Sequence, residues 1–143
     1  MAYVNYYQAL LNDLRTVLRT EFPNIQVLIG DVATLKNNPC IVLEPYDKDI
    51  DTESTHGKKD FKFLVYIWIY HQHNTEEQAV KLLTELAEQV EELLIDDKKY
   101  PTDSGTSWYN STPKNVSYGG TTKGELFTRT VLLKWEFRHR VNK

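Results

Sequence analysis

The sequence contains little cysteine, glycine or proline, and it has no long hydrophobic run. Of its 143 residues, one is cysteine, six are glycine and five are proline. The lone cysteine, Cys40, cannot form an intramolecular disulfide, which excludes a small secreted scaffold built on disulfides and favours a reducing compartment. No stretch approaches the roughly 18 consecutive apolar residues that a membrane-spanning helix needs. The start, MAYVNYYQALLNDLR, has no basic n-region, so we expect no secretory signal.

A basic excess is missing as well. Lys and Arg number 17 against 20 Asp and Glu, which gives a formal net charge of −3, whereas generic nucleic-acid binders are usually basic. The charge is unevenly distributed: residues 75–97 hold eight acids against Lys81, and residues 123–143 hold six bases against Glu125 and Glu136. These two segments can attract each other within one chain or between copies, or they are simply two solvated faces.

Two segments have the periodicity of amphipathic helices. From Tyr7 to Phe22 the apolar residues recur every three or four positions, and Pro23 ends the predicted helix because proline has no amide proton. Thr75–Gln78 has the sequence of a capping box, in which the two polar side chains bond amides of the first turn. The helix that follows is predicted to run for about twenty residues, with its acids on one face, and to end near Asp96.

Five segments have the composition of strands. They are residues 25–29, 40–44, 61–70, the region around 115–118, and 125–139. Pro45 is predicted to end the second strand, and Gly119–Gly124 to form a hairpin turn before the last one. The order helix, strand, strand, strand, helix, strand, strand predicts an α+β fold in which one mixed or antiparallel sheet packs against two amphipathic helices. We expect a single domain over residues 1–143, with polar loops near residues 46–60 and 98–114.

The predicted strand at residues 61–70 is apolar on both of its faces. One face carries Phe61, Phe63, Val65, Ile67 and Ile69, and the other carries Lys62, Leu64, Tyr66, Trp68 and Tyr70. One face is expected to meet the helices and the other to meet something else, such as another subunit. Trp108 and Tyr109 stand in an otherwise polar stretch, and aromatic residues of this kind are enriched at interface hot spots. The alternative is that these side chains fold back on the protein's own core.

No set of residues completes a catalytic pattern. His71 and His73 fall on one side of a strand end, but a zinc site requires three or four ligands. Cys40 lies in an apolar run, where a thiol packs as a small hydrophobe and stays protonated. The sequence has neither a phosphate-binding glycine loop nor a G-x-S-x-G element. We therefore expect no enzyme activity, no catalytic residue, no cofactor and no metal, with a small metal-dependent enzyme using the two histidines as the remote alternative.

A run of alternating acids has the outward form of a calcium site. It consists of Asp47, Asp49, Asp51 and Glu53. The glycine and the glutamate that an EF-hand loop requires are replaced here by Thr52 and Lys58. The segment is therefore predicted to be a solvated acidic loop, which can dock on a basic partner surface.

The order of these elements resembles that of a known family. A helix ends at Glu21–Pro23, a short strand follows, and the next strand lies within Asn38–Pro45, with the sequence NPCIVLEP. The aromatic strand Phe61–Tyr70, an acidic amphipathic helix and a carboxy-terminal strand hairpin complete the chain. Over nearly its whole length the sequence resembles the tail terminator, or tail-to-head joining, proteins of long-tailed bacteriophages.

The resemblance implies a structural virion protein that forms a homo-oligomeric ring, commonly of six copies. Such a ring caps the tail tube, stops its polymerisation and joins the tail to the head connector, while DNA passes through the lumen. The implied partners are further copies of the chain, the tail tube protein and the head connector or head-closure protein, with no membrane. The implied location is the tail–neck region of the virion, and the host cytoplasm before assembly. The alternative is another neck, head-closure or tail-completion subunit.

Ten residues are candidates for subunit or partner contacts. They are Asp47, Asp49, Asp51, Glu53, Tyr66, Trp68, Trp108, Tyr109, Arg138 and Arg140. They combine the acidic run, the outer face of the aromatic strand, the isolated aromatic pair and the basic carboxy-terminal strand. No catalytic or cofactor-binding role is implied for any of them.

Overall fold

The structure, a computed structural model, describes residues 6–30, 39–51, 58–95, 110–123 and 126–142. Its elements are, in chain order, α1 (Tyr6–Glu21), β1 (Gln26–Ile29), β2 (Cys40–Asp51), β3 (Lys58–His73), α2 (Glu76–Ile95), β4 (Asn110–Lys123) and β5 (Leu126–Asn142). The predicted α+β fold and its order of elements are confirmed. No helix in these ranges has the length and apolar character needed to cross a membrane.

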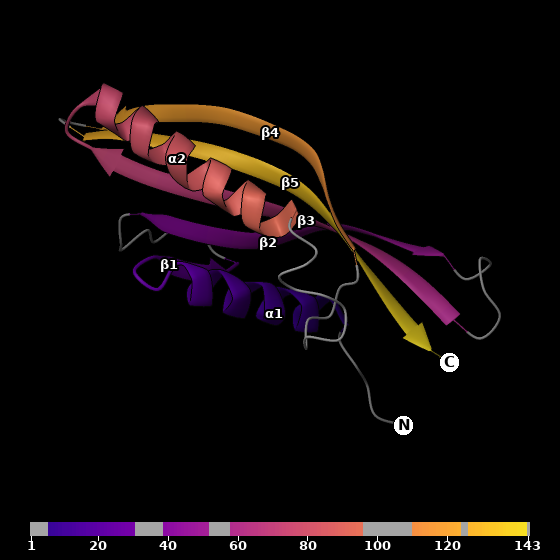
Figure 1. Cartoon of the computed structure of the whole chain (residues 1–143). Coiled ribbons are helices and arrows are strands. Elements are labelled where there is room, and N and C mark those ends of the chain that lie inside the picture. The colour runs from indigo at the N-terminus through magenta and orange to yellow at the C-terminus, as the bar shows by residue number, and fades with distance from the viewer. Residues whose placement is uncertain (1–5, 31–38, 52–57, 96–109, 124–125, 143) are drawn as a thin grey trace.

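The five strands form one mixed sheet with the order β1-β2-β3-β5-β4. β1 pairs with β2 in parallel, and every other pairing is antiparallel. Helix α1 packs on β1 and β2, whereas α2 packs across β3, β5 and β4, and Figure 1 shows the two helices side by side along the sheet. Both helices contribute to a single hydrophobic core, so they cover the same face of the sheet.

The two helices are confirmed close to their predicted bounds. The apolar stripe of α1 is buried through Leu10, Leu14 and Leu18, and the helix ends before Pro23, as the missing amide proton requires. Helix α2 has 20 residues, as predicted, with its acids on the outer side. In the described residues the hydroxyl of Thr75 contacts Nδ1 of His73 at 3.3 Å, in place of the predicted capping-box bond to the first turn of α2.

Alternation along β3 divides the core from the opposite face. Phe63, Val65 and Ile67 are fully buried beneath the helices, together with the large side chains Trp135 and Phe137 of β5. The indole Nε1 of Trp135 donates a hydrogen bond of 2.5 Å to Oγ of Ser111 on β4. A buried polar atom that is satisfied in this way avoids the desolvation penalty of an unpaired donor. The core therefore accounts for one of the two apolar faces predicted for the aromatic strand.

The prediction that Pro45 ends the second strand is wrong. β2 continues to Asp51 and β3 begins at Lys58, so most of the described part of the predicted 46–60 loop is strand. β1 pairs only with Cys40–Leu43, which leaves the rest of β2 at the edge of the sheet, where a proline removes no ladder hydrogen bond. The pairing with β3 shifts by one residue between Pro45 and Asp47, which is the signature of a β-bulge.

The hydroxyl of Tyr7 on α1 is placed at this bulge. It accepts a 3.1 Å hydrogen bond from the amide of Tyr46 and contacts the carbonyl oxygens of Asp47, at 3.1 Å, and Leu64. The ring of Tyr7 meanwhile packs against Phe63, with centroids 4.6 Å apart. One helical side chain thus satisfies backbone groups on two strands where the regular ladder is interrupted.

The last two strands are also longer than predicted. β4 runs from Asn110 to Lys123 and includes Pro113, Gly119 and Gly120, so the glycines lie in the strand and not in the turn. β4 is an edge strand, and a second register shift lies between Pro113 and Asn115; both features make a proline tolerable there. β5 extends to Asn142, three residues beyond the predicted end. Residues 110–114 of the second predicted polar loop therefore belong to β4, and residues 98–109 lie outside the described residues.

Candidate functional site

The face of the sheet opposite the helices carries a row of aromatic rings. Tyr66, Trp68 and Tyr70 alternate with the buried residues of β3 and are half-buried. Tyr46, at the bulge of β2, adds a fourth ring and is 57% exposed. We call these four residues the aromatic face. It fits the prediction that the aromatic strand has a second apolar surface which the helices do not cover.

The rings of the aromatic face contact one another in sequence. Tyr46 stacks on Tyr66 with centroids 4.3 Å apart and planes inclined by 15°. Tyr66 meets Trp68 edge-on at 6.3 Å and 84°, and Trp68 stacks on Tyr70 at 6.2 Å and 23°. Such geometries stabilise aromatic pairs beyond their buried area. The rings therefore form one continuous and ordered surface.

Small and aliphatic side chains flank the rings on the neighbouring strands. In register, Trp68 is flanked by Val42 on β2 and Leu132 on β5, and Tyr70 by Cys40. Cys40 is fully buried, and burial raises the pKa of its thiol, which fits the predicted role of a small hydrophobe. Burial also raises the pKa of Tyr70, so its phenol stays neutral.

A group of bases borders the aromatic face at one end. It consists of Lys62 on β3, Lys114 on β4, and Lys134 and Arg138 on β5, arranged around Glu136; we call it the basic patch. Lys62 and Arg138 are directly opposite each other in register. The Nζ atom of Lys134 lies 5.5 Å from the centroid of the Tyr66 ring, within cation–π range. The basic patch and the aromatic face thus adjoin.

Glu136 organises the centre of the basic patch. Its Oε2 atom lies 2.8 Å from Nζ of Lys114, and its Oε1 atom lies 3.3 Å from Nε of Arg138. Burial raises the pKa of Glu136, but the hydrogen bonds from Lys114 and Arg138 outweigh it and hold that pKa below its ordinary value. The carboxylate therefore stays ionised. The five residues of the patch include four bases and this one acid, and Asp49 on β2 lies opposite Lys62 in register.

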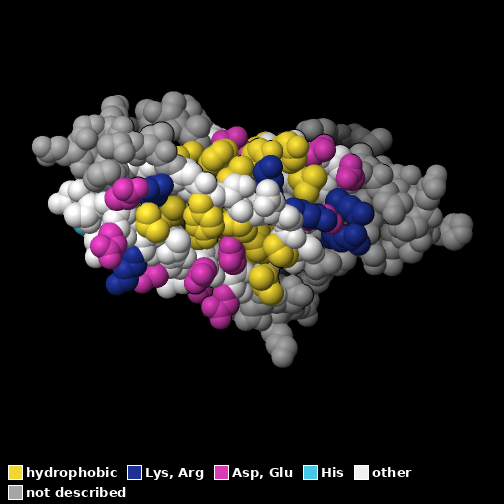
Figure 2. Space-filling view, turned by 90° about the horizontal axis from the view of Figure 1, so that it is seen from above, with side chains coloured by type: hydrophobic (Ala, Val, Ile, Leu, Met, Phe, Trp, Pro, Cys, Tyr) yellow, Lys and Arg dark blue, Asp and Glu magenta, His cyan; other side chains and the backbone are white. Residues whose placement is uncertain are grey.

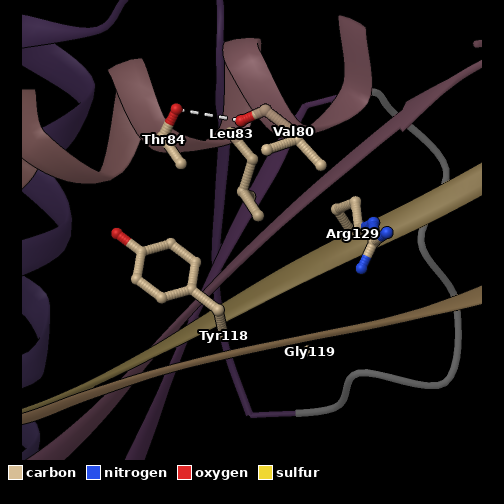
Figure 3. A pocket seen from close by; sticks show the side chains of 6 residues that line it. All are labelled: Val80, Leu83, Thr84, Tyr118, Gly119 and Arg129. Carbon is tan, nitrogen blue, oxygen red and sulfur yellow. Dashed lines mark hydrogen bonds between the residues drawn. The ribbon is translucent and has the colours of Figure 1, made fainter. Parts of the chain in front are cut away.

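A groove runs between α2 and the β4–β5 hairpin. Its first part is a hollow of about 200 Å³ lined by Val80, Leu83, Thr84, Tyr118, Gly119 and Arg129. Figure 3 shows the Tyr118 ring rising from β4 toward Thr84 on the helix, with Leu83 and Val80 above it and Arg129 to one side. Arg129 forms an ion pair with Glu76 in the first turn of α2.

The groove continues into an acidic part. A second hollow, of about 420 Å³, is lined by Glu88, Glu91, Glu92 and Ile95. Burial and, secondarily, the charges of the carboxylates Glu91 and Glu88 raise the pKa of Tyr118. Burial and the charge of Glu88 also raise the pKa of Glu91. We call the two hollows together the acidic groove.

The candidate contact residues fall into three groups. Tyr66 and Trp68 lie on the aromatic face, and Arg138 lies in the basic patch. Asp47, Asp49 and Asp51 belong to β2 and not to a loop, which corrects that part of the prediction, and Arg140 belongs to β5. Glu53, Trp108 and Tyr109 lie outside the described residues.

Sequence reasoning missed several members of these surfaces. The sequence prediction places Tyr46 in a loop, because it expects Pro45 to end the second strand. Tyr118 and Val80, which are 53% and 40% exposed, received no role. The available signal for Tyr46 was the period-two alternation with Glu44, and for Tyr118 it was a single aromatic ring in an otherwise polar strand.

The two histidines of the strand end have different surroundings. His71 is buried, and burial lowers its pKa, whereas Nδ1 of His73 accepts a 3.2 Å hydrogen bond from the amide of Thr75. Within the ranges that the structure describes, no three His, Cys, Asp or Glu side chains gather to hold a metal ion.

Comparisons with known proteins complete the description of the site. No family model matches the sequence, and no curated protein matches it either. Among solved structures, the chain is similar to a chain of the virion of a native gene transfer agent particle. The TM-score is 0.50 at 13% sequence identity, over 95% of this chain and 92% of that one. At this identity, the likeness shows that the two chains share a fold.

Proposed function

We propose that this chain is a structural virion protein, the tail terminator of a phage-like particle, and that it acts as a homo-oligomeric ring. The ring caps the tail tube, stops its polymerisation and joins the tail to the head connector. The observation that carries the proposal is the aromatic face: four ordered rings on a sheet face that neither helix covers. Aromatic residues are enriched where protein subunits make their strongest contacts.

The structural likeness supports the same class of function. The similar chain belongs to a virion, and the likeness extends over almost all of both chains. A shared fold does not by itself specify a shared role, so the surfaces of this chain carry the argument. An apolar face bordered by charge is what a subunit needs to bind a neighbour with defined orientation.

The candidate contact residues have definite places in this proposal. Tyr66 and Trp68 face a neighbouring subunit, and Arg138 and Arg140 supply positive charge beside that contact. The acids of β2, Asp47 and Asp49 among them, contact the tail tube. The chain performs no catalysis, and DNA only passes through the lumen of the ring.

A tube-length assay tests the proposal. The cognate tail tube protein is polymerised with increasing amounts of this chain, and tube lengths are measured by negative-stain electron microscopy. We expect capped and shorter tubes, with Lys81→Ala as a control variant that behaves like the parent chain, because Lys81 is exposed and lines neither the aromatic face nor the acidic groove. Tubes of undiminished length that are bound to the head connector through this chain would assign it instead to a neck or head-closure role.

A further inference from the structure

The two charged surfaces lie toward opposite ends of the β4–β5 hairpin. Tyr118, in the acidic groove, pairs with Val131, whereas Arg138, in the basic patch, pairs with Asn110 at the start of β4. Figure 2 shows a band of yellow side chains across the middle of the molecule, with a group of blue side chains toward one end and several magenta ones along the lower border. The molecule is therefore electrically asymmetric along the hairpin.

Among the described residues, most of the charge in the acidic groove has no ion-pair partner. The ion pair between Arg129 and Glu76 uses the first acid of α2. None of the three acids Glu88, Glu91 and Glu92 forms an ion pair within the described ranges, and burial, together with the charge of Glu88, raises the pKa of Glu91. Three clustered carboxylates without a counter-charge repel one another, and a cation that docks beside them relieves this repulsion.

Each surface combines charge with exposed apolar area. In the acidic groove the apolar part is formed by Val80, Tyr118 and Ile95, all of them exposed. Beside the basic patch it is formed by Tyr46 and Tyr66 of the adjoining aromatic face, and Lys134 lies over the ring of Tyr66. The two surfaces thus both have exposed apolar area, and their charges are opposite in sign. This arrangement gives an interface both affinity and orientation.

We propose that the acidic groove of one copy receives the basic patch, and the adjoining rings of the aromatic face, of a second copy. This inference rests on the proposed homo-oligomeric function and names the contact that builds it. Because the two surfaces lie toward opposite ends of the β4–β5 hairpin, we place the groove of each copy against the patch of the next one, in a head-to-tail arrangement. Head-to-tail contacts of this kind close into a ring when the rotation between neighbours divides the circle.

Charge reversal on each surface tests the contact. The groove variant is Glu88→Lys with Glu92→Lys, and the patch variant is Lys62→Glu with Lys134→Glu, which leaves both partners of Glu136 in place. Sedimentation at low salt is expected to show association weakened by about tenfold or more in either variant. Circular dichroism and urea unfolding establish that each variant is folded. A control, Glu77→Lys with Glu85→Lys, makes the same charge change on α2 outside both hollows and is expected to associate normally.

Combining the two reversals gives the decisive measurement. The chain with all four substitutions again has a groove and a patch of opposite sign, so its association is expected to return to near the parent level. An equimolar mixture of the groove variant and the patch variant is also expected to associate, because each surface then finds its complement on the other variant.

Three outcomes overturn the inference. The first is association that neither charge reversal affects. The second is a fourfold variant that associates as weakly as the groove variant and the patch variant. The third is an unmodified chain that stays monomeric while its acidic groove binds the tube protein or its basic patch binds DNA. The tube-length assay tests the proposed function independently of this contact. A chain that still shortens tubes in any of these cases retains the proposed function and loses only this contact.

Discussion

The ring of Tyr46 stacks on that of Tyr66, with centroids 4.3 Å apart, directly at the bulge that lets β2 continue past Pro45. The bulge shifts the pairing of β2 against β3 by one residue, and it is followed by the exposed acids of β2. The most accessible ring of the aromatic face therefore depends on an irregularity in the sheet. Tyr46 lies against the ring of Tyr66, yet more than half of its side chain remains accessible to a partner.

Replacing this ring separates assembly from folding. We expect Tyr46→Ala to weaken self-association while it lowers the free energy of unfolding by only about 1 kcal/mol or less, as is usual for exposed positions away from the core. Sedimentation over a range of concentrations measures the first quantity, and urea unfolding measures the second. Association at the parent level would show that Tyr46 lies outside the contact.

The hydroxyl of Tyr7 gives a prediction about stability. Tyr7→Phe keeps the ring on Phe63 but leaves the amide of Tyr46 and the carbonyl of Leu64 without this partner. Unpaired groups of this kind cost about 1–3 kcal/mol, so we expect the urea midpoint to fall with the slope unchanged. Tyr118→Phe is the matched control, because the Tyr118 side chain is exposed and its loss of a hydroxyl leaves stability nearly unaltered. Equal effects in the two variants would contradict the bridging role of Tyr7.

The lowered pKa of Glu136 predicts a pH dependence. Because the folded-state pKa lies below the unfolded one, the carboxylate contributes stability above the unfolded value, and this contribution is lost as the pH falls through the folded value. Glu136→Gln is therefore expected to be less stable than the parent near pH 7, with a difference that shrinks between about pH 5 and pH 3. Urea unfolding at each pH measures both chains. A difference that stays constant over this range would show that Glu136 acts through packing alone.

Salt dependence distinguishes charge from packing at the carboxy-terminal strand. Arg138→Glu with Arg140→Glu is expected to impair self-association more at low salt than at high salt, because dissolved ions already screen the contact at about 1 M. Sedimentation in a series of salt concentrations measures the effect. A loss of association that is independent of salt would indicate that these side chains contribute by packing.

Local patterns predicted the helices and the pairing of apolar faces well. Helix α1 ends before Pro23 and α2 has its predicted 20 residues, because helix periodicity and termination depend on neighbours in sequence. The second face of the strand from Phe61 to Tyr70 also followed from period-two alternation. The continuation of β2 past Pro45 and the start of β4 before Pro113 did not follow from it. A proline is tolerated at a sheet edge, and edge position depends on which strands pair.

The charged surfaces were harder to predict for the same reason. Lys62, Lys114 and Arg138 come together from three strands, and one of them lies at a bulge. The sequence identified an acidic segment and a basic segment, but their separation along the hairpin is a property of register. The groove itself arises from the position of α2 over the β4–β5 hairpin, which no local pattern encodes.

The edge strand β4 has one more consequence. At Pro113 β4 has no amide hydrogen to donate, the bulge that follows breaks its regular spacing, and Lys114 adds a charge that is half exposed. Sheet edges with such features resist pairing with the edge strands of other molecules. The β4 edge of this sheet is therefore a poor template for the addition of further strands, which disfavours growth into amyloid-like fibres.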